Sequence, residues 1–169
     1  MSRVRANLLV GGNGMTTLAG SSRPLSNAAD RRRFHTLRES AGAIAIGGST
    51  YRNEPYSKSS IPLYVSTRSQ GLTGVNARFL NLSPFELVKL ALSENAKDLL
   101  VEGGVNFLSE LIEREAIDEL NITRVQKDGD GYPFDEAQLE RHYQLVSSEK
   151  SGDTVFELWR PRKLLSNRD

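Results

Sequence analysis

The 169-residue sequence contains no cysteine. A chain without cysteine forms no disulfide, uses no thiolate nucleophile and builds no cysteine-ligated zinc site. Its two histidines, His35 and His142, are far apart and have no cluster of acidic ligands beside them. We therefore expect no metal site, and the absence of cysteine is typical of a reducing compartment.

Long apolar runs and an excess of charge are also missing. No apolar stretch approaches the roughly 20 residues that cross a bilayer, and residues 1–5 lack the apolar segment of a secretion signal. The 22 Lys and Arg residues nearly balance the 21 Asp and Glu residues, which leaves a net charge of +1. Neither nucleic acid nor a membrane is therefore expected as a partner, and we expect a soluble, cytoplasmic protein.

Most of the sequence alternates between short apolar runs and amphipathic stretches, which predicts an α/β fold. Helices are expected after the candidate caps Ser26 and Asn27, with an end at Gly42, and also after Ser83 and from Val105. Residues 51–60 are expected to be irregular. Strands are expected at residues 4–10, 43–46, 61–65, 77–80, 99–101 and 120–125.

The C-terminal part departs from this alternation. Residues 128–133 are rich in turn formers, and two strands, 143–148 and 154–159, predict a β-hairpin whose first strand opens at His142. The sequence thus predicts a single α/β domain with a central mixed, mostly parallel sheet, flanked by helices and closed by the hairpin. The domain is expected to cover residues 1–160, and a polar tail residues 161–169.

Two of the predicted strands end in a pair of glycines, Gly47-Gly48 and Gly103-Gly104. Ligands bind where a parallel strand ends and the next helix begins, and free N–H groups there favour a phosphate. Two such turns can hold two parts of one extended, phosphate-bearing cofactor. The alternative is two ordinary connections between a strand and a helix. A third glycine-rich stretch, Gly12-Asn13-Gly14, lacks the remaining residues of a dinucleotide or Walker motif.

Four segments, in their order and spacing, resemble the dihydrofolate-reductase-like superfamily, and most specifically the reductase domain of the bifunctional deaminase-reductase of riboflavin biosynthesis. The resemblance extends over about residues 4–160. It implies a dihydrofolate-reductase-like fold, NADPH as the cofactor and hydride donor, and a homodimer. The segments are the strand and loop 6–14, Phe34-His35-Thr36-Leu37-Arg38, Ile46-Gly47-Gly48-Ser49-Thr50 and Leu100-Val101-Glu102-Gly103-Gly104.

The resemblance also implies which residues form the site. Glu102 is the candidate catalytic residue, and the candidate substrate-binding residues are Ser22, Arg38 and Glu54. The cofactor positions implied are Gly47, Gly48, Thr50, Thr67, Gly103, Gly104, Val105 and Asn106.

Two departures from the family pattern lie on the substrate side. The family's Asp-Asp-Pro turn is Asn53-Glu54-Pro55 here, so Asn53 and Glu54 are both candidates to replace the acid. The family's Leu-Thr-Val-Arg, whose arginine helps to hold the substrate, is absent, and residues 56–60 stand in its place. Lys58 can supply a charge there, but lysine does not reproduce a bidentate arginine. The substrate is therefore left open.

Three side chains have two interpretations each. Glu102 can orient the substrate or relay a proton, or it can organise the following turn. Arg38 can bind a substrate phosphate, or it can complement the dipole at a helix C-terminus. Asp30 is the one acid near the start of the first long helix, where folate reductases carry an acid, and we interpret it as stabilising that helix N-terminus.

Three functions remain open from the sequence. The first is an NADPH-dependent reductase of a small nitrogen-containing compound, resembling 5-amino-6-(5-phosphoribosylamino)uracil reductase. The second is a related reductase that acts on a pterin, a folate or another substrate. The third is a non-catalytic, dimeric nucleotide-binding protein. The zinc signature of nucleobase deaminases is absent, so a deaminase half is not expected.

Overall fold

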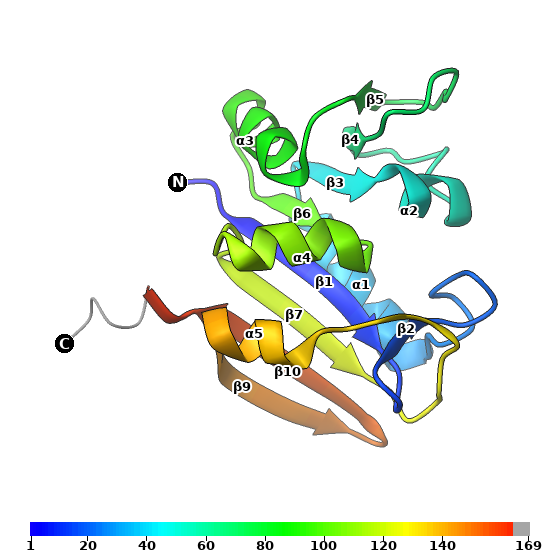
Figure 1. Ribbon diagram of the computed structural model, residues 1–169, viewed down its shortest axis with the longest axis vertical. Coiled ribbons are helices and arrows are strands. Elements are labelled where there is room, and N and C mark those ends of the chain that lie inside the picture. Colours follow the sequence, from blue (N-terminus) through cyan, green and yellow to red (C-terminus); the bar gives the residue numbers. More distant parts are fainter. Residues whose placement is uncertain (164–169) are drawn as a thin grey trace.

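The computed structural model describes residues 1–163, and its main element is an eight-stranded sheet in the order β5-β4-β3-β6-β1-β7-β10-β9 (Figure 1). Strands β1 and β3 to β7 run parallel, and β10 pairs antiparallel with both β7 and β9. The predicted mixed, mostly parallel sheet and its closing hairpin are confirmed. The strands are β1 (Val4–Val10), β3 (Ala43–Gly47), β4 (Leu63–Ser66), β5 (Ala77–Leu80), β6 (Leu99–Val101), β7 (Glu119–Arg124), β9 (Tyr143–Ser151) and β10 (Thr154–Pro161).

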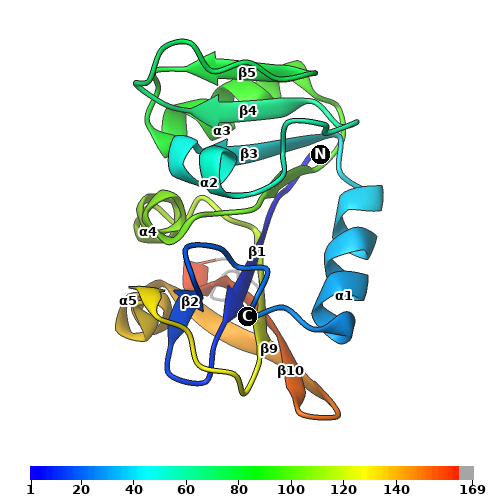
Figure 2. The same ribbon diagram turned by 90° about the vertical axis from the view of Figure 1, so that its right-hand side faces the viewer.

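Helices cover both faces of the sheet. α3, α4 and α5 pack on one face, and Figure 2 shows α1 on the opposite face. Apolar side chains between these layers form the core, in which all three residues of β6 are fully buried. The helices are α1 (Ala28–Glu39), α2 (Gly48–Asn53), α3 (Pro84–Glu94), α4 (Val105–Glu113) and α5 (Glu136–His142).

The predicted helix starts are confirmed where a cap was visible in the sequence. The Asn27 side chain accepts a hydrogen bond from the Asp30 backbone N–H at the start of α1, and Ser83 and Glu86 form a capping box on α3. The end of α1 is earlier than the predicted Gly42. Arg5 donates to the Leu37 carbonyl in the last turn of α1, and the chain then turns toward β3.

Short and polar elements were missed. α2 spans residues 48–53, part of which was predicted to be irregular. Its buried residues are Gly48 and Tyr51, and these two give no apolar periodicity from which a helix could be predicted. His142 ends α5 instead of opening a strand, and the cap Asp135 was the available signal. Two further three-residue strands, β2 (Met15–Thr17) and β8 (Gly131–Pro133), pair with each other.

The last strand ends later than predicted. β10 continues through Pro161, so the sheet extends one residue beyond the predicted domain end. Residues 164–169 of the predicted polar tail lie outside the described residues. No helix in the described part of the chain is long and apolar enough to cross a membrane.

Candidate functional site

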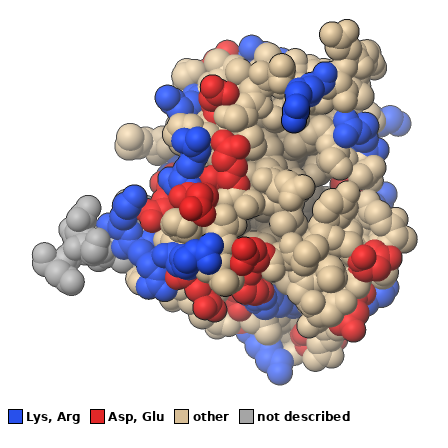
Figure 3. All heavy atoms as spheres, viewed as in Figure 1, with Lys and Arg blue, Asp and Glu red and all other residues tan. Residues whose placement is uncertain are grey.

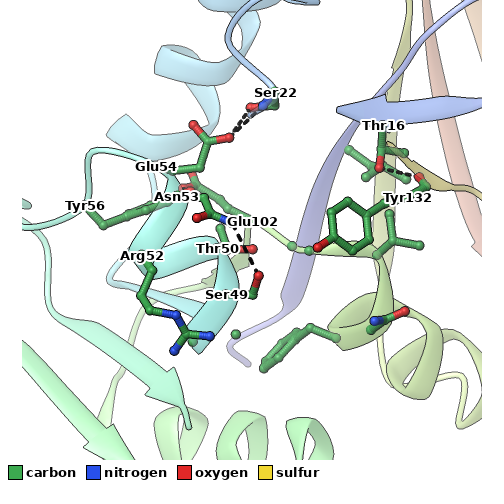
Figure 4. Close-up of a pocket in the computed structure, with 18 of the residues that line it drawn as sticks. Thr16, Ser22, Ser49, Thr50, Arg52, Asn53, Glu54, Tyr56, Glu102 and Tyr132 are labelled. Atoms are coloured by element: carbon green, nitrogen blue, oxygen red, sulfur yellow. Dashed lines mark hydrogen bonds between the residues drawn. The ribbon is translucent and has the colours of Figure 1, made fainter. Parts of the chain in front are cut away.

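A cavity of about 1160 Å³ opens at the edge of the sheet where the parallel strands β1, β3, β4 and β6 have their carboxyl ends. Figure 3 shows this side of the molecule hollowed between its upper and lower parts. In Figure 4, residues of α2 and the loop after it face Thr16 and Tyr132 across the cavity. Every site residue proposed from the sequence lines it: Ser22, Arg38, Gly47, Gly48, Thr50, Glu54, Thr67, Glu102, Gly103, Gly104, Val105 and Asn106.

The two glycine turns meet at this cavity. The Gly47 backbone N–H donates to the Gly103 carbonyl at 3.2 Å, so the turns after β3 and β6 are directly joined. Gly47 caps α2 and Gly104 caps α4 without any side-chain hydrogen bond. Backbone N–H groups at the start of α4 are therefore left for a ligand.

The backbone requires glycine at position 103, and close neighbours leave little room for a side chain at positions 48 and 104. Gly103 has φ +97°, which disfavours any residue with a Cβ, and the peptide bond from Gly103 to Gly104 is cis. A Cβ at Gly104 would lie 3.1 Å from Thr50 Oγ1, and one at Gly48 would lie 2.8 Å from Thr67 Oγ1. The two predicted threonines thus pack directly against the glycines.

Glu102 is engaged by two side chains. Arg38 donates from Nε and Nη2 to the two carboxylate oxygens at 2.7 and 2.6 Å. The Tyr56 hydroxyl donates to Glu102 Oε2 at 2.6 Å. The Glu102 side chain is 1% exposed and that of Arg38 27% exposed. The structure therefore joins the candidate catalytic acid to a candidate substrate-binding residue, and it adds Tyr56, which the sequence analysis did not single out.

Burial and charge shift the pKa values in this cluster. Burial strongly raises the pKa of the Tyr56 hydroxyl, and the neighbouring Glu102 charge raises it further, so Tyr56 stays protonated as a donor. Burial lowers the pKa of Arg38, but hydrogen bonding and the charge of Glu102 outweigh it, and the net pKa is raised. Arg38 is therefore a permanent cation next to a carboxylate.

Two other predicted substrate residues contact each other. Glu54 Oε1 accepts hydrogen bonds from the Ser22 backbone N–H at 2.7 Å and from the Ser22 hydroxyl at 2.9 Å (Figure 4). Asn53, the other candidate for the family acid, lies instead near Ser49 Oγ, to which its side-chain amide donates at 3.5 Å. Glu54 thus connects the loop before α1 to the end of α2.

Asp30 is more deeply buried than an acid needs to be if it only stabilises a helix N-terminus. It is 7% exposed, lines the cavity, and accepts a hydrogen bond from Ser26 Oγ at 2.6 Å. Burial raises its pKa above the ordinary value, partly offset by this hydrogen bond and by Arg31. Asn7 Oδ1, also on the cavity wall, has no hydrogen-bond partner among the described residues. The sequence signal was the one acid in the first turn of α1, directly before three arginines.

The far end of the cavity, after β4, is basic. Thr67, Arg68 and Ser69 follow this strand and line the cavity. Arg52 of α2 donates from Nη1 to Ser69 Oγ at 3.3 Å, and both arginines are otherwise exposed. Within residues 1–163, no group of three or more His, Asp or Glu side chains is arranged to hold a metal ion.

Comparisons with known proteins agree with this architecture. A family model described as the RibD C-terminal domain matches residues 12–156. The crystal structure of a diaminohydroxyphosphoribosylaminopyrimidine deaminase/5-amino-6-(5-phosphoribosylamino)uracil reductase from Thermotoga maritima superposes with a TM-score of 0.75. The sequences are 16% identical, so this likeness shows the fold. The superposition covers 95% of this chain but 56% of the other chain. No curated protein matches the sequence.

Proposed function

The chain belongs to the RibD C-terminal domain family, and from this premise we propose that it is an NADPH-dependent reductase of a small nitrogen-containing compound. Its activity would resemble that of the 5-amino-6-(5-phosphoribosylamino)uracil reductases of riboflavin biosynthesis. The observation that carries the proposal is the junction of two glycine turns, with Gly47 bonded to Gly103, at one wall of the cavity.

The residues at this wall fit an extended dinucleotide. Gly103 and Gly104 leave the backbone open to close approach, and the free N–H groups at the start of α4 suit a diphosphate. Thr50, packed against Gly104, can donate its hydroxyl to the same ligand. Bound NADPH supplies a hydride, and the chain supplies the geometry and a route for the proton.

Arg52 and Arg68 support NADPH over NADH. Both lie at the basic end of the cavity, and Arg52 is held by Ser69. A phosphate monoester on the adenosine ribose is the one group that distinguishes NADPH from NADH, and arginine is well suited to bind it.

Replacing Arg68 or Arg52 with alanine is expected to weaken NADPH binding by about tenfold or more, the effect of losing one charge-assisted contact. NADH binding should change little. Cofactor fluorescence titrations measure both affinities. Arg23→Ala is the matched control, since Arg23 is also an exposed arginine on the cavity wall. Equal losses for NADPH and NADH would contradict this assignment.

The buried carboxyl of Asp30 favours a second candidate, a reductase of a pterin or a folate. A carboxyl group with a raised pKa takes up a proton more readily than an ordinary one, and its oxygens can accept hydrogen bonds from ring N–H and amino groups. Asn7 Oδ1 offers a further acceptor on the same cavity wall. Heterocycles that present several N–H donors satisfy these groups.

Asp30→Asn is expected to stabilise the fold while reducing activity. Because the folded-state pKa of Asp30 is raised, its contribution to stability is fully present below the unfolded pKa and is lost as the pH rises. The asparagine variant should therefore match the wild type near pH 4 and exceed its Tm by about 2 °C or more at pH 7. Thermal melts at several pH values measure the difference.

Asp98→Asn provides a control of opposite sign. Burial raises the pKa of Asp98, but the hydrogen bonds and charge of Arg3 outweigh this effect, so the net pKa is below the ordinary value. Its contribution is present above the unfolded pKa and lost as the pH falls. This variant should be less stable than the wild type at pH 7. A difference in Tm between Asp30→Asn and the wild type that does not change with pH would argue against a buried ionisable carboxyl.

NADPH oxidation, followed by absorbance with a panel of ribosylaminopyrimidine phosphate, pterin and folate substrates, tests the proposed function. Turnover of the pyrimidine substrate supports the first candidate, and turnover of a pterin or folate alone supports the second. Tight NADPH binding without turnover of any substrate would instead support a non-catalytic nucleotide-binding protein. Failure to bind NADPH would contradict both reductase proposals.

A further inference from the structure

Tyr132 is the most exposed of the Phe, Tyr and Trp residues in the described part of the chain. It is 50% exposed, whereas the others are buried or half-buried. The residue lines the main cavity, and in Figure 4 it faces the residues of α2 from the opposite side. Packing in the core therefore does not explain why an aromatic ring stands at this position.

The backbone does not explain the tyrosine either. Tyr132 has φ +52°, which lies in the left-handed region. Glycine and asparagine adopt this region readily, whereas a bulky side chain is disfavoured there. A tyrosine at this position thus costs free energy in the backbone and gains little from the core. The cavity is the remaining place where its ring can make contacts.

Hydrogen bonds fix the loop that carries Tyr132. The residue is part of β8, which pairs with β2 in the segment after β1. The hydroxyl of the buried Thr16 donates to the Tyr132 carbonyl at 2.6 Å, and the Phe134 N–H donates to the Gly14 carbonyl at 2.9 Å. Phe134 is itself buried in the main core. The backbone under the ring is therefore preorganised, and little of its freedom is lost when a ligand binds.

Tyr132 also lies away from the basic end of the cavity. In the sheet, β6 and β1 separate β3 and β4 from β7. Arg52 and Arg68 belong to the segments after β3 and β4, and Tyr132 belongs to the segment after β7. The neighbouring cavity residues of β2 are Thr16 and Thr17, which carry no charge. This side of the cavity suits a flat, neutral group, whereas the basic end suits a phosphate.

We propose that Tyr132 is a binding residue whose ring stacks on a planar heterocycle of a bound ligand. The inference rests on the proposed reductase function, because hydride transfer requires contact between the nicotinamide ring and the substrate. Both therefore occupy the same part of the cavity. The chemistry that Tyr132 recognises is the π face of a flat heteroaromatic ring, supplied by the nicotinamide or by the substrate.

Tyr132→Asn removes the ring while suiting the left-handed backbone, and Tyr132→Gly is a second variant of the same kind. Each is expected to weaken binding of the stacked ligand by about tenfold, the usual effect of losing one aromatic stack. Calorimetric titrations compare NADPH with the ADP-ribose phosphate that remains when its nicotinamide is removed. The KM for the substrate that the wild type turns over tests the other ring. Tyr132→Phe, which keeps the ring, should behave like the wild type.

The two sources of the ring give different results. Weaker binding of NADPH with unchanged binding of ADP-ribose phosphate assigns the nicotinamide to Tyr132. A raised KM with unchanged NADPH affinity assigns the ring of the substrate. Equal losses for NADPH and ADP-ribose phosphate, or no change in both NADPH affinity and KM, would overturn the inference. A wild type that does not bind NADPH contradicts the proposed function, and the inference is then lost with it.

Stability separates this role from a structural one. Tyr132→Asn should have a Tm no lower than that of the wild type, since asparagine accepts the left-handed backbone. Ala19→Gly is the matched control, because Ala19 also has φ +52° and its N–H donates to Asp130 in the loop before Tyr132. Ala19 contributes no side chain to the described cavity wall. Its variant should leave both affinities and the KM unchanged. Equal effects of Ala19→Gly and Tyr132→Asn would show that the loop matters and the ring does not.

Discussion

A Gly104→Asp variant is expected to lose at least about 100-fold in NADPH affinity, because close approach of like charges costs several kcal/mol. Gly104 is the residue before α4, at the wall proposed to receive the diphosphate. A carboxylate there would face the negative charge of the ligand. It would also bind the free N–H groups at the start of α4, which are proposed to hold the diphosphate.

The fold itself should tolerate this change. Aspartate is a favourable residue before a helix, and the φ of Gly104 is −78°, which any residue adopts. Fluorescence titration with NADPH measures the loss of affinity, and circular dichroism checks that the variant is folded. Gly104→Ala is the steric control, because its Cβ meets Thr50 Oγ1 at 3.1 Å without adding charge. Unchanged NADPH affinity in folded Gly104→Asp would refute the cofactor assignment.

Glu102→Ala is expected to lower the free energy of unfolding by about 3 kcal/mol, the usual cost of removing one partner of a buried ion pair. The variant leaves Arg38 without its carboxylate, and it leaves the hydroxyl of the buried Tyr56 without an acceptor. For a chain of this length the Tm should fall by about 10 °C. Denaturant and thermal unfolding measure the two quantities.

Glu94→Ala is a chemically matched control for this loss. Glu94 also accepts from one arginine and one tyrosine, Arg78 and Tyr64, but the Glu94 side chain is 36% exposed and that of Arg78 49% exposed. Water replaces the lost partner at an exposed site, so the expected cost is about 1 kcal/mol or less. Equal losses in the two variants would mean that burial does not determine the strength of the Glu102 cluster.

Local sequence signals were enough to predict much of this fold. The cap at Asn27, the capping box at Ser83 and the two glycine pairs each act within a few residues, and all stand where they were expected. The short helix α2 and the paired strands β2 and β8 were missed, because a few polar residues carry no periodic pattern. Their form depends on contacts distant in sequence.

The same reason explains what the sequence could not predict about the candidate site. Arg38 and Glu102 are 64 residues apart, and Tyr56 and Glu102 are 46 residues apart, so nothing local indicates that they are paired. The burial of Asp30 likewise depends on where α1 packs, not on its neighbours in the chain. Sequence reasoning selected residues that do line one cavity, but it did not predict which of them contact one another.

The hydrogen bond between Gly47 and Gly103 has a thermodynamic consequence for any ligand of this cavity. Two loops that are already tied together lose little further freedom when a ligand joins them, so less of the interaction energy goes into ordering the protein. An extended ligand that spans both turns then gains from each contact nearly in full. A ligand that reaches one turn alone makes only part of these contacts and gains less. The junction therefore favours a ligand long enough to span both turns over a shorter one, through backbone contacts alone.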